Sequence, residues 1–124
     1  MSERLLIADD DAAIVSVVRR YFEARGWEVE ACLRADDAVR QLESAAAFDA
    51  CVCDLHFSPA RLSEGLDVLQ QARRLRPGLP LLLFTGAPEA GALAAASQLG
   101  AGVVQKPAPL ASLHDAVLRA MKAK

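Results

Sequence analysis

Polar side chains whose types could do metal or phosphoryl chemistry stand directly after short apolar runs at four points in this chain. Asp9-Asp10-Asp11 follow the first run, Asp54 follows a central one, and Thr85-Gly86 and Lys106-Pro107 follow the last two. Clustered carboxylates repel one another unless protons or a cation neutralise them. A hard divalent ion is the simplest solution, which predicts Mg²⁺ as the cofactor, with Mn²⁺ expected to substitute for it.

The lysine and the hydroxyl complete a set that can hold a transferring phosphoryl group. Catalysis of phosphoryl transfer depends mostly on positioning and on stabilising the charge of the equatorial oxygens. A carboxylate can itself be the nucleophile and form an aspartyl-phosphate. Asp54 is the best candidate for this nucleophile because it stands alone after the central apolar run.

The apolar runs predict the strands that position these groups. Runs that are apolar throughout suit parallel strands covered on both faces, whereas an alternating run suits a strand at the edge of a sheet. The uniform runs are Leu5–Ala8, Ala50–Cys53, Leu81–Phe84 and Gly102–Val104, and the alternating run is Trp27–Ala31.

Between the runs, apolar residues recur at three- and four-residue steps, which predicts one helix after each strand. The helical stripes are Ile14 to Phe22 with a stop at Gly26, Val39 to Leu42, Leu66 to Leu75, Leu93 to Leu99 and Leu110 to Met121. Strict alternation of strands and helices predicts an α/β fold with a parallel sheet and helices on both faces. Ligands of such sheets bind at the carboxyl ends of the strands, where the polar groups stand.

Size and charge restrict the possible functions. The 124 residues and 13.2 kDa fit one domain, 1–124, with 53% hydrophobic and 24% charged residues. A net charge of -2 gives no electrostatic reason for direct binding to nucleic acid or to an anionic membrane. Cys32, Cys51 and Cys53 lie in apolar surroundings and favour a reducing compartment, so we expect a cytoplasmic protein.

The polar groups and their flanks resemble a known family. Leu5-Leu6-Ile7-Ala8-Asp9-Asp10-Asp11, Cys53-Asp54-Leu55, Phe84-Thr85-Gly86 and Val104-Gln105-Lys106-Pro107 are similar, in order and separation, to the motifs of response-regulator receivers of two-component (phosphorelay) signalling. The resemblance implies a CheY-like (βα)5 fold, doubly wound like flavodoxin, with a parallel five-stranded sheet in the strand order 2-1-3-4-5. It also implies that residues 1–124 form a single receiver domain.

Carried over by position, the resemblance implies a role for each polar residue. Asp9 and Asp10 form the acidic pocket, with Asp10 as a direct metal ligand and Asp9 acting largely through water. Asp54 is both metal ligand and phosphoacceptor, and the backbone carbonyl of His56 is a further metal ligand. The phosphate oxygens contact Thr85, the Gly86 amide and Lys106, and the Lys106–Pro107 peptide bond is expected to be cis.

The chain departs from the family pattern at a few positions. Val103 stands where receivers often carry a Tyr or Phe whose rotation reports phosphorylation, so the usual coupling to the last helices is altered. The segment from Asp54 to Gly65 is longer than usual, and Ala108 replaces a common Phe. We also hypothesise that the His56 side chain tunes autodephosphorylation.

Structural interpretations suit several other residues. Asp11 is expected to cap the first helix. Cys51 and Cys53 share one face of a strand and behave as small hydrophobes. Arg73, Arg74 and Arg76 end a helix, where positive charge complements the helix dipole.

Three functions compete for this sequence. The leading one is a signalling switch that catalyses only its own phosphorylation and slow autodephosphorylation and is otherwise not an enzyme. A sensor histidine kinase or histidine phosphotransfer protein phosphorylates Asp54, and the affinity of the domain for a downstream effector or output domain then changes. A homodimer through the last two helices is a further expectation. The alternatives are a pseudo-receiver that binds partners without phosphorylation, favoured by Val103 and the long loop, and a free-standing Mg²⁺ phosphohydrolase.

Overall fold

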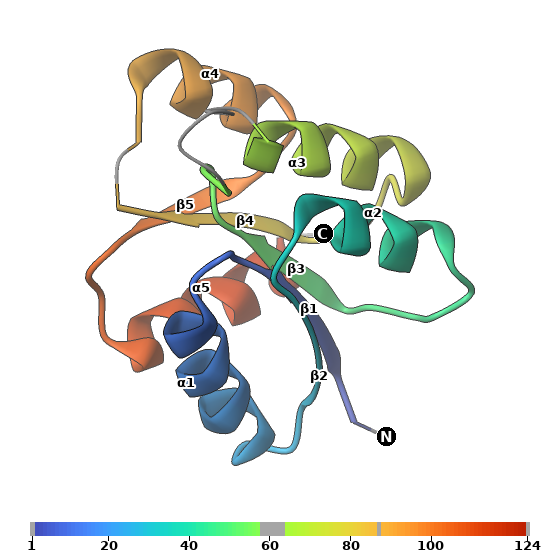
Figure 1. Cartoon of the computed structure of the whole chain (residues 1–124), viewed down its shortest axis with the longest axis vertical. Coiled ribbons are helices and arrows are strands. Elements are labelled where there is room, and N and C mark those ends of the chain that lie inside the picture. Colours follow the sequence, from blue (N-terminus) through green and yellow to red (C-terminus); the bar gives the residue numbers. More distant parts are fainter. Residues whose placement is uncertain (1, 58–63, 87, 124) are drawn as a thin grey trace.

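The computed structural model describes residues 2–57, 64–86 and 88–123, in which five parallel strands alternate with five helices (Figure 1). The strands are β1 (Arg4–Ala8), β2 (Glu28–Cys32), β3 (Ala50–Cys53), β4 (Leu81–Thr85) and β5 (Gly102–Gln105). The helices are α1 (Ala12–Glu23), α2 (Ala35–Glu43), α3 (Glu64–Leu75), α4 (Ala90–Gln98) and α5 (Leu110–Lys122).

The sheet order is β2-β1-β3-β4-β5, which confirms the predicted fold class and strand order. The order reverses between β1 and β3, the point at which doubly wound sheets bind ligands. Ala8 of β1 is in register with Cys32 of β2 on one side and with Cys53 of β3 on the other. Asp9 and Asp54, the next residue in each chain segment, therefore leave the sheet side by side.

Helices cover both faces of the sheet and create two buried clusters. α2, α3 and α4 lie over one face and α1 and α5 over the other (Figure 1). β3 and β4 are buried at every residue, because central parallel strands are covered on both sides, whereas β5 at the edge is mostly exposed. Cys51 and Cys53 point into the same buried cluster, so the prediction that they pack as small hydrophobes is confirmed.

Local chemistry explains where α1 begins and ends. The Asp11 side chain accepts hydrogen bonds from the amides of Ala13 at 3.0 Å and Ile14 at 3.3 Å, which confirms the predicted N-cap. Gly26, just beyond the helix, has a φ of +88°, a left-handed conformation that glycine adopts without the steric cost of a side chain. The chain can then turn directly into β2.

Two arginines at the end of α3 bind the backbone of neighbouring segments. Arg73 donates from Nε to the carbonyl of Leu99 at 2.8 Å, and from Nη1 to the carbonyls of Pro77 at 2.6 Å and Leu79 at 2.9 Å. Sequence patterning predicted only a helix-end charge here and missed these contacts. They fix the positions of the segments that lead into β4 and β5.

Arg76 performs the corresponding task at the end of α2. Its Nε donates to the carbonyl of Leu42 at 3.1 Å and its Nη2 to the carbonyl of Ser44 at 2.9 Å, while its guanidinium lies 5.2 Å from the ring centre of Phe48. Among the described residues, Arg74 forms side-chain hydrogen bonds with Gln71 alone. Across the part of the chain that the structure describes, none of the helices combines the length and apolarity needed to span a bilayer.

Candidate functional site

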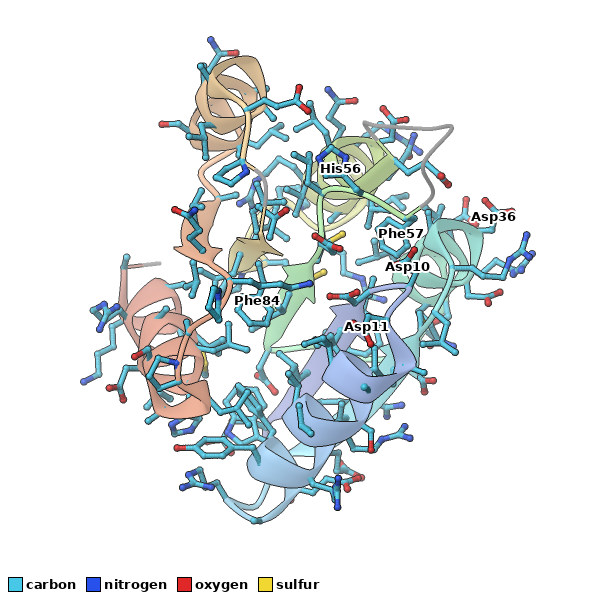
Figure 2. The ribbon with its side chains drawn as sticks, turned by 60° about the vertical axis from the view of Figure 1, so that its left-hand side comes forward. Asp10, Asp11, Asp36, His56, Phe57 and Phe84 are labelled. Atoms are coloured by element: carbon cyan, nitrogen blue, oxygen red, sulfur yellow. The ribbon has the colours of Figure 1, made fainter. Side chains whose placement is uncertain are left out.

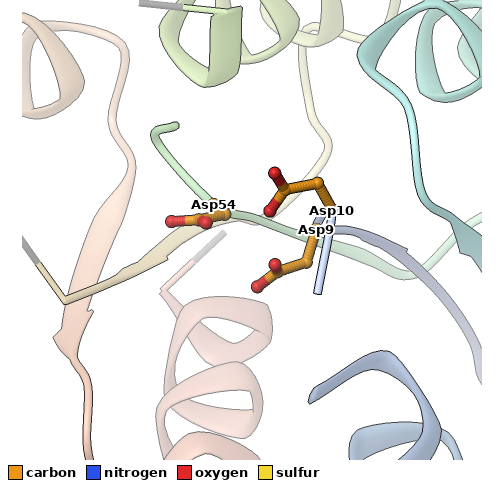
Figure 3. Close-up of side chains that lie close together, drawn as sticks. All are labelled: Asp9, Asp10 and Asp54. Carbon is orange, nitrogen blue, oxygen red and sulfur yellow. The ribbon is translucent and has the colours of Figure 1, made fainter. Parts of the chain in front are cut away.

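An acidic cluster forms where β1 and β3 end. One carboxylate oxygen from each of Asp9, Asp10 and Asp54 lies within 4.8 Å of the others (Figure 3). The backbone sets this arrangement, since the amide of Asp54 donates to the carbonyl of Ala8 at 2.9 Å and the amide of Asp9 donates to that of Cys32 at 3.0 Å. Oxygen atoms at this spacing can share one divalent cation.

Burial makes the cluster electrostatically demanding. Asp9 is 1% exposed and Asp54 is 9% exposed, while Asp10 is exposed to solvent. Burial, and to a smaller degree the nearby Asp54 charge, raise the pKa of Asp9 above its ordinary value, although hydrogen bonds from Lys106 and from the Asp11 amide oppose the shift. A bound cation would favour the ionised carboxylates that burial disfavours.

The carboxylates accept hydrogen bonds that orient them. Asp9 accepts from the Asp11 amide through Oδ1 at 3.0 Å and from Lys106 Nζ through Oδ2 at 2.6 Å. Asp54 accepts from the Leu55 amide through Oδ1 at 2.8 Å, which leaves Oδ2 facing Lys106 Nζ at 3.5 Å. The ammonium therefore lies between the two carboxylates and closer to Asp9 than to Asp54.

The ends of β4 and β5 complete the site. Thr85 is 1% exposed at the end of β4, and its carbonyl accepts from the Lys106 amide at 2.9 Å, which holds the two strand ends together. Gly86 follows in an exposed position, and a Cβ at Gly86 would lie 3.7 Å from Lys106 Cβ. The Lys106–Pro107 bond is cis, and Lys106 Nζ lies 5.2 Å from the ring centre of Phe84.

His56 lies on the segment that follows β3, near the sheet edge that carries Asp10 (Figure 2). Its Nε2 is 3.7 Å from Oε1 of Glu89, just before α4, and its Nδ1 is buried with no hydrogen-bond partner in the described part of the chain. Val103 is 40% exposed on the edge strand β5 and does not belong to the acidic cluster.

Gly65 is a site residue whose importance the sequence analysis missed. A Cβ at Gly65 would lie 1.8 Å from the carbonyl oxygen of Asp54, and its amide donates to the carbonyl of Leu55 at 2.9 Å. The first turn of α3 therefore packs directly on the backbone of Asp54. A glycine in the first turn of the helix that follows a candidate nucleophile was the available signal, because glycine in a helix is costly unless close packing requires it.

The chain belongs to the response regulator receiver domains: residues 5–118 match the model of that family. It is thus a CheY-like component of two-component signalling, a class of proteins that are typically phosphoacceptors rather than enzymes and that work with sensor kinases. The acidic cluster of Asp9, Asp10 and Asp54 corresponds to the divalent-metal site typical of receivers.

A curated relative agrees with this assignment. The chain is 39% identical over 87 residues to the response regulator MprA of Mycobacterium ulcerans, a match that covers 68% of this chain and 35% of that protein. The chain thus matches about a third of the length of this curated relative.

Solved structures show the same fold. A receiver domain protein (CheY-like) from Methanospirillum hungatei superposes with a TM-score of 0.91 at 26% identity, covering 99% of this chain and 96% of that one. A response regulator protein from Burkholderia pseudomallei, solved with a phosphorylated aspartic acid, a calcium ion and citrate, has a TM-score of 0.84 at 25% identity and covers 98% of this chain and 71% of that one.

Proposed function

We propose that Asp54 accepts a phosphoryl group from a phosphohistidine on a sensor histidine kinase or histidine phosphotransfer protein, and that residues 1–124 form a single receiver domain. The observation that carries the proposal is the convergence of Asp9, Asp10, Asp54 and Lys106 at one edge of the sheet. The phosphorylated aspartic acid in the Burkholderia pseudomallei relative supports this assignment.

The donor set fits Mg²⁺, with Mn²⁺ as a substitute. Its members are carboxylate oxygens, which hard divalent ions prefer, and the desolvated Asp9 needs positive charge nearby. Asp10, Asp54 and the backbone carbonyl of His56 would be direct ligands, and Asp9 would act through water. When bound, the ion would neutralise the charge that develops on the phosphoryl oxygens.

In the proposed reaction, a carboxylate oxygen of Asp54 attacks phosphorus in line with the phosphohistidine nitrogen. The new P–O bond forms as the P–N bond breaks, and the bonding electron pair stays on the imidazole nitrogen. Lys106, Thr85 and the Gly86 amide bind the phosphoryl oxygens. Lys106 Nζ is already 3.5 Å from Asp54 Oδ2, so a small shift away from Asp9 brings it to the phosphoryl group.

Phosphorylation would then change affinity for a downstream effector or output domain, which requires differential binding to the two states. The last two helices, α4 and α5, are the proposed surface for the effector or for a homodimer. The burial of the three free cysteines supports a reducing compartment, the cytoplasm, as the place where the protein works.

A second candidate function is a pseudo-receiver that binds its partner without phosphorylation. The exposed Val103 favours it, because valine has no large rotamer to swing inward when Thr85 moves. The complete set of acid, hydroxyl and lysine groups favours the phosphoacceptor instead.

Incubation with Mg²⁺ and a small phosphodonor, followed by intact-mass measurement, tests the proposal. We expect one phosphoryl group on the wild-type chain, and none on Asp54→Asn or after chelation of the metal. Asp115→Asn, which removes an exposed carboxylate on α5, is the matched control and should be labelled like wild type. Equal labelling of Asp54→Asn, or no labelling of wild type from either a small donor or a phosphorylated histidine protein, would refute the phosphoacceptor and leave the pseudo-receiver.

A further inference from the structure

The side chain of Phe84 lies between the acidic edge of the sheet and α5. Phe84 precedes Thr85 on β4 and is 4% exposed. It belongs to the buried cluster that the sheet forms with α1 and α5, together with Leu113 and Val117 of α5 (Figure 2). Since side chains in a close-packed core cannot move independently, a displacement of this ring must be accommodated by α5.

The same ring contacts the ammonium group of the acidic edge. Lys106 Nζ lies 5.2 Å from the centre of the Phe84 ring, within the distance at which the negative face of an aromatic ring attracts a cation. The Lys106 side chain is 19% exposed, so water screens this attraction only in part. Nζ also lies 2.6 Å from Asp9 Oδ2 and 3.5 Å from Asp54 Oδ2. The ammonium is thus held by two carboxylates and by a ring that packs beneath α5.

Of these groups, the Lys106 ammonium is the one that can move. The Lys106 backbone is tied to β4 by the hydrogen bond from its amide to the Thr85 carbonyl, but its four-carbon stem is flexible. In the proposed function, the ammonium leaves Asp9 for the phosphoryl group. A phosphoryl group carries about two negative charges, so it neutralises the ammonium more fully than one carboxylate does. The attraction between the ammonium and the Phe84 ring then falls.

We propose that Phe84 transmits the phosphorylation state of Asp54 to α5 by responding to the position of the Lys106 ammonium. In the unphosphorylated chain, the ammonium attracts the ring and favours one packing of Phe84 against α5. When the ammonium pairs with the phosphoryl group, a second packing becomes more populated. A cation–ring contact is strong enough to change the ratio of two such packings by about twofold to thirtyfold. The phosphorylation step of this inference rests on the proposed function, whereas the link from Lys106 through Phe84 to α5 does not.

Trp27 provides an optical signal for the position of α5. It is the single tryptophan of the chain and is 5% exposed. Its ring centre lies 6.4 Å from that of His114 on α5, in an edge-on arrangement. Trp27 directly precedes β2, at the edge where the strands begin, so its emission responds to α5 rather than directly to charge at the opposite edge.

The link is tested first without phosphorylation, by hydrogen–deuterium exchange of the α5 amides in metal-free protein. We expect Lys106→Met, which removes the charge and keeps most of the stem, to change α5 exchange by about threefold or more in the wild-type background and by less than half as much in Phe84→Leu. Phe22→Leu is the matched control, because it makes the same substitution in the same cluster at a ring that contacts His114. In this background Lys106→Met should keep its full effect. Equal effects of Lys106→Met in the wild-type and Phe84→Leu backgrounds would overturn the proposal.

A fluorinated ring separates the charge contact from packing. Trifluorophenylalanine in place of Phe84 has nearly the shape of the natural side chain, but its fluorine atoms withdraw the negative charge from the ring face. We expect α5 in this protein to respond to Lys106→Met as weakly as it does in Phe84→Leu. A full response would show that the ammonium does not act through the ring face, and it would overturn the proposal even if Phe84→Leu did not fold.

The second test adds Mg²⁺ and a small phosphodonor. We expect phosphorylation of the wild-type chain to change α5 exchange and Trp27 emission, and Phe84→Leu to lose most of both changes at the same extent of phosphorylation by intact mass. An undiminished response of phosphorylated Phe84→Leu would overturn the proposal. Failure of the proposed function is recognised separately, by the absence of the mass change in wild type, and the metal-free comparison then still decides whether Lys106 acts on α5 through Phe84.

Discussion

The edge of the sheet where the strands begin and the edge where they end use charged side chains in opposite ways. At the edge where the strands begin, Arg73 and Arg76 each donate to several backbone carbonyls, and the Asp49 carboxylate accepts from the Arg4 amide at 2.7 Å. At the edge where the strands end, the carboxylates of Asp9 and Asp54 share one ammonium. At the first edge these three side chains are paired with backbone groups of the protein, whereas at the second the carboxylates of Asp9, Asp10 and Asp54 outnumber the one ammonium of Lys106.

This difference separates stability from function within one small fold. A charge whose partners are fixed backbone carbonyls holds loops in place and has no capacity left for a ligand. Buried carboxylates that exceed their counter-charge destabilise the metal-free protein and gain the most from a cation or a phosphoryl group. Variants at the edge where the strands begin should therefore act mainly on stability, and variants at the acidic edge mainly on the response to a ligand. Four predictions test this division.

The largest expected effect comes from Gly65→Ala, at the boundary between α3 and the site. The new Cβ would meet the Asp54 carbonyl oxygen at 1.8 Å, so α3 or the Asp54 segment must move. We expect a loss of more than about 4 kcal/mol in the free energy of unfolding, measured with urea, together with loss of Mg²⁺-dependent phosphorylation.

Gly91→Ala in α4 is the matched control, because no atom of another described segment lies within 4 Å of the place that its methyl group would occupy. Alanine favours helix, so this variant should be as stable as wild type or more stable by up to about 1 kcal/mol. Similar stability of Gly65→Ala and Gly91→Ala would show that the contact with Asp54 does not constrain the site.

At the opposite edge, Arg73→Ala should cost about 3 kcal/mol, because it removes charged hydrogen bonds to the carbonyls of Pro77, Leu79 and Leu99. Of the interactions seen in residues 2–57, 64–86 and 88–123, the adjacent Arg74→Ala removes hydrogen bonds with Gln71 on the protein surface, and it should change stability by less than about 0.5 kcal/mol. Urea unfolding measures both. Equal effects of the two substitutions would contradict the assignment, as would a change in Mg²⁺ affinity for folded Arg73→Ala.

Metal binding should stabilise the protein only through the acidic edge. At a Mg²⁺ concentration of about 100 times the Kd, linkage predicts a gain of about 2.7 kcal/mol in the free energy of unfolding. Asp10→Asn removes a proposed direct ligand and should lose most of this gain, whereas Asp115→Asn should keep it. Thermal unfolding with and without Mg²⁺ measures the gain, and an equal shift in all three chains would exclude specific binding at the cluster.

Much of this division could be predicted from the sequence. The uniform apolar runs that became β3 and β4 placed Asp54 and Thr85 at strand ends, because central parallel strands need apolar side chains on both faces. Strict alternation with helices then put all the polar groups at one edge. The family motifs added the strand order, which the periodicity of one chain does not determine.

The remaining features depend on how the helices pack onto the sheet. The approach of Gly65 to Asp54 and the reach of Arg73 to Leu99 join residues far apart in sequence, and no local pattern reports such contacts. The same holds for Lys106, whose Nζ lies 2.6 Å from Asp9 and 3.5 Å from Asp54, a difference too small for motif spacing to predict. Sequence thus located the acidic edge well and its internal contacts poorly.

The smallest expected effect is a pH dependence that belongs to the acidic edge alone. Burial raises the pKa of Asp9 above its ordinary value of 3.8, while Lys106 and the Asp11 amide limit the rise. Between 3.8 and the raised value, the folded metal-free protein binds more protons than the unfolded chain, so the contribution of Asp9 to stability falls as pH rises through this window. Urea unfolding of wild type and Asp9→Asn with a chelator should therefore show wild type losing stability relative to the variant as pH increases.

With saturating Mg²⁺ the ionised carboxylate is favoured and this relative loss should shrink or reverse. A relative gain with rising pH in the chelator would mean that Lys106, rather than burial, dominates the Asp9 environment, and the acidic edge would then be as well compensated as the opposite one.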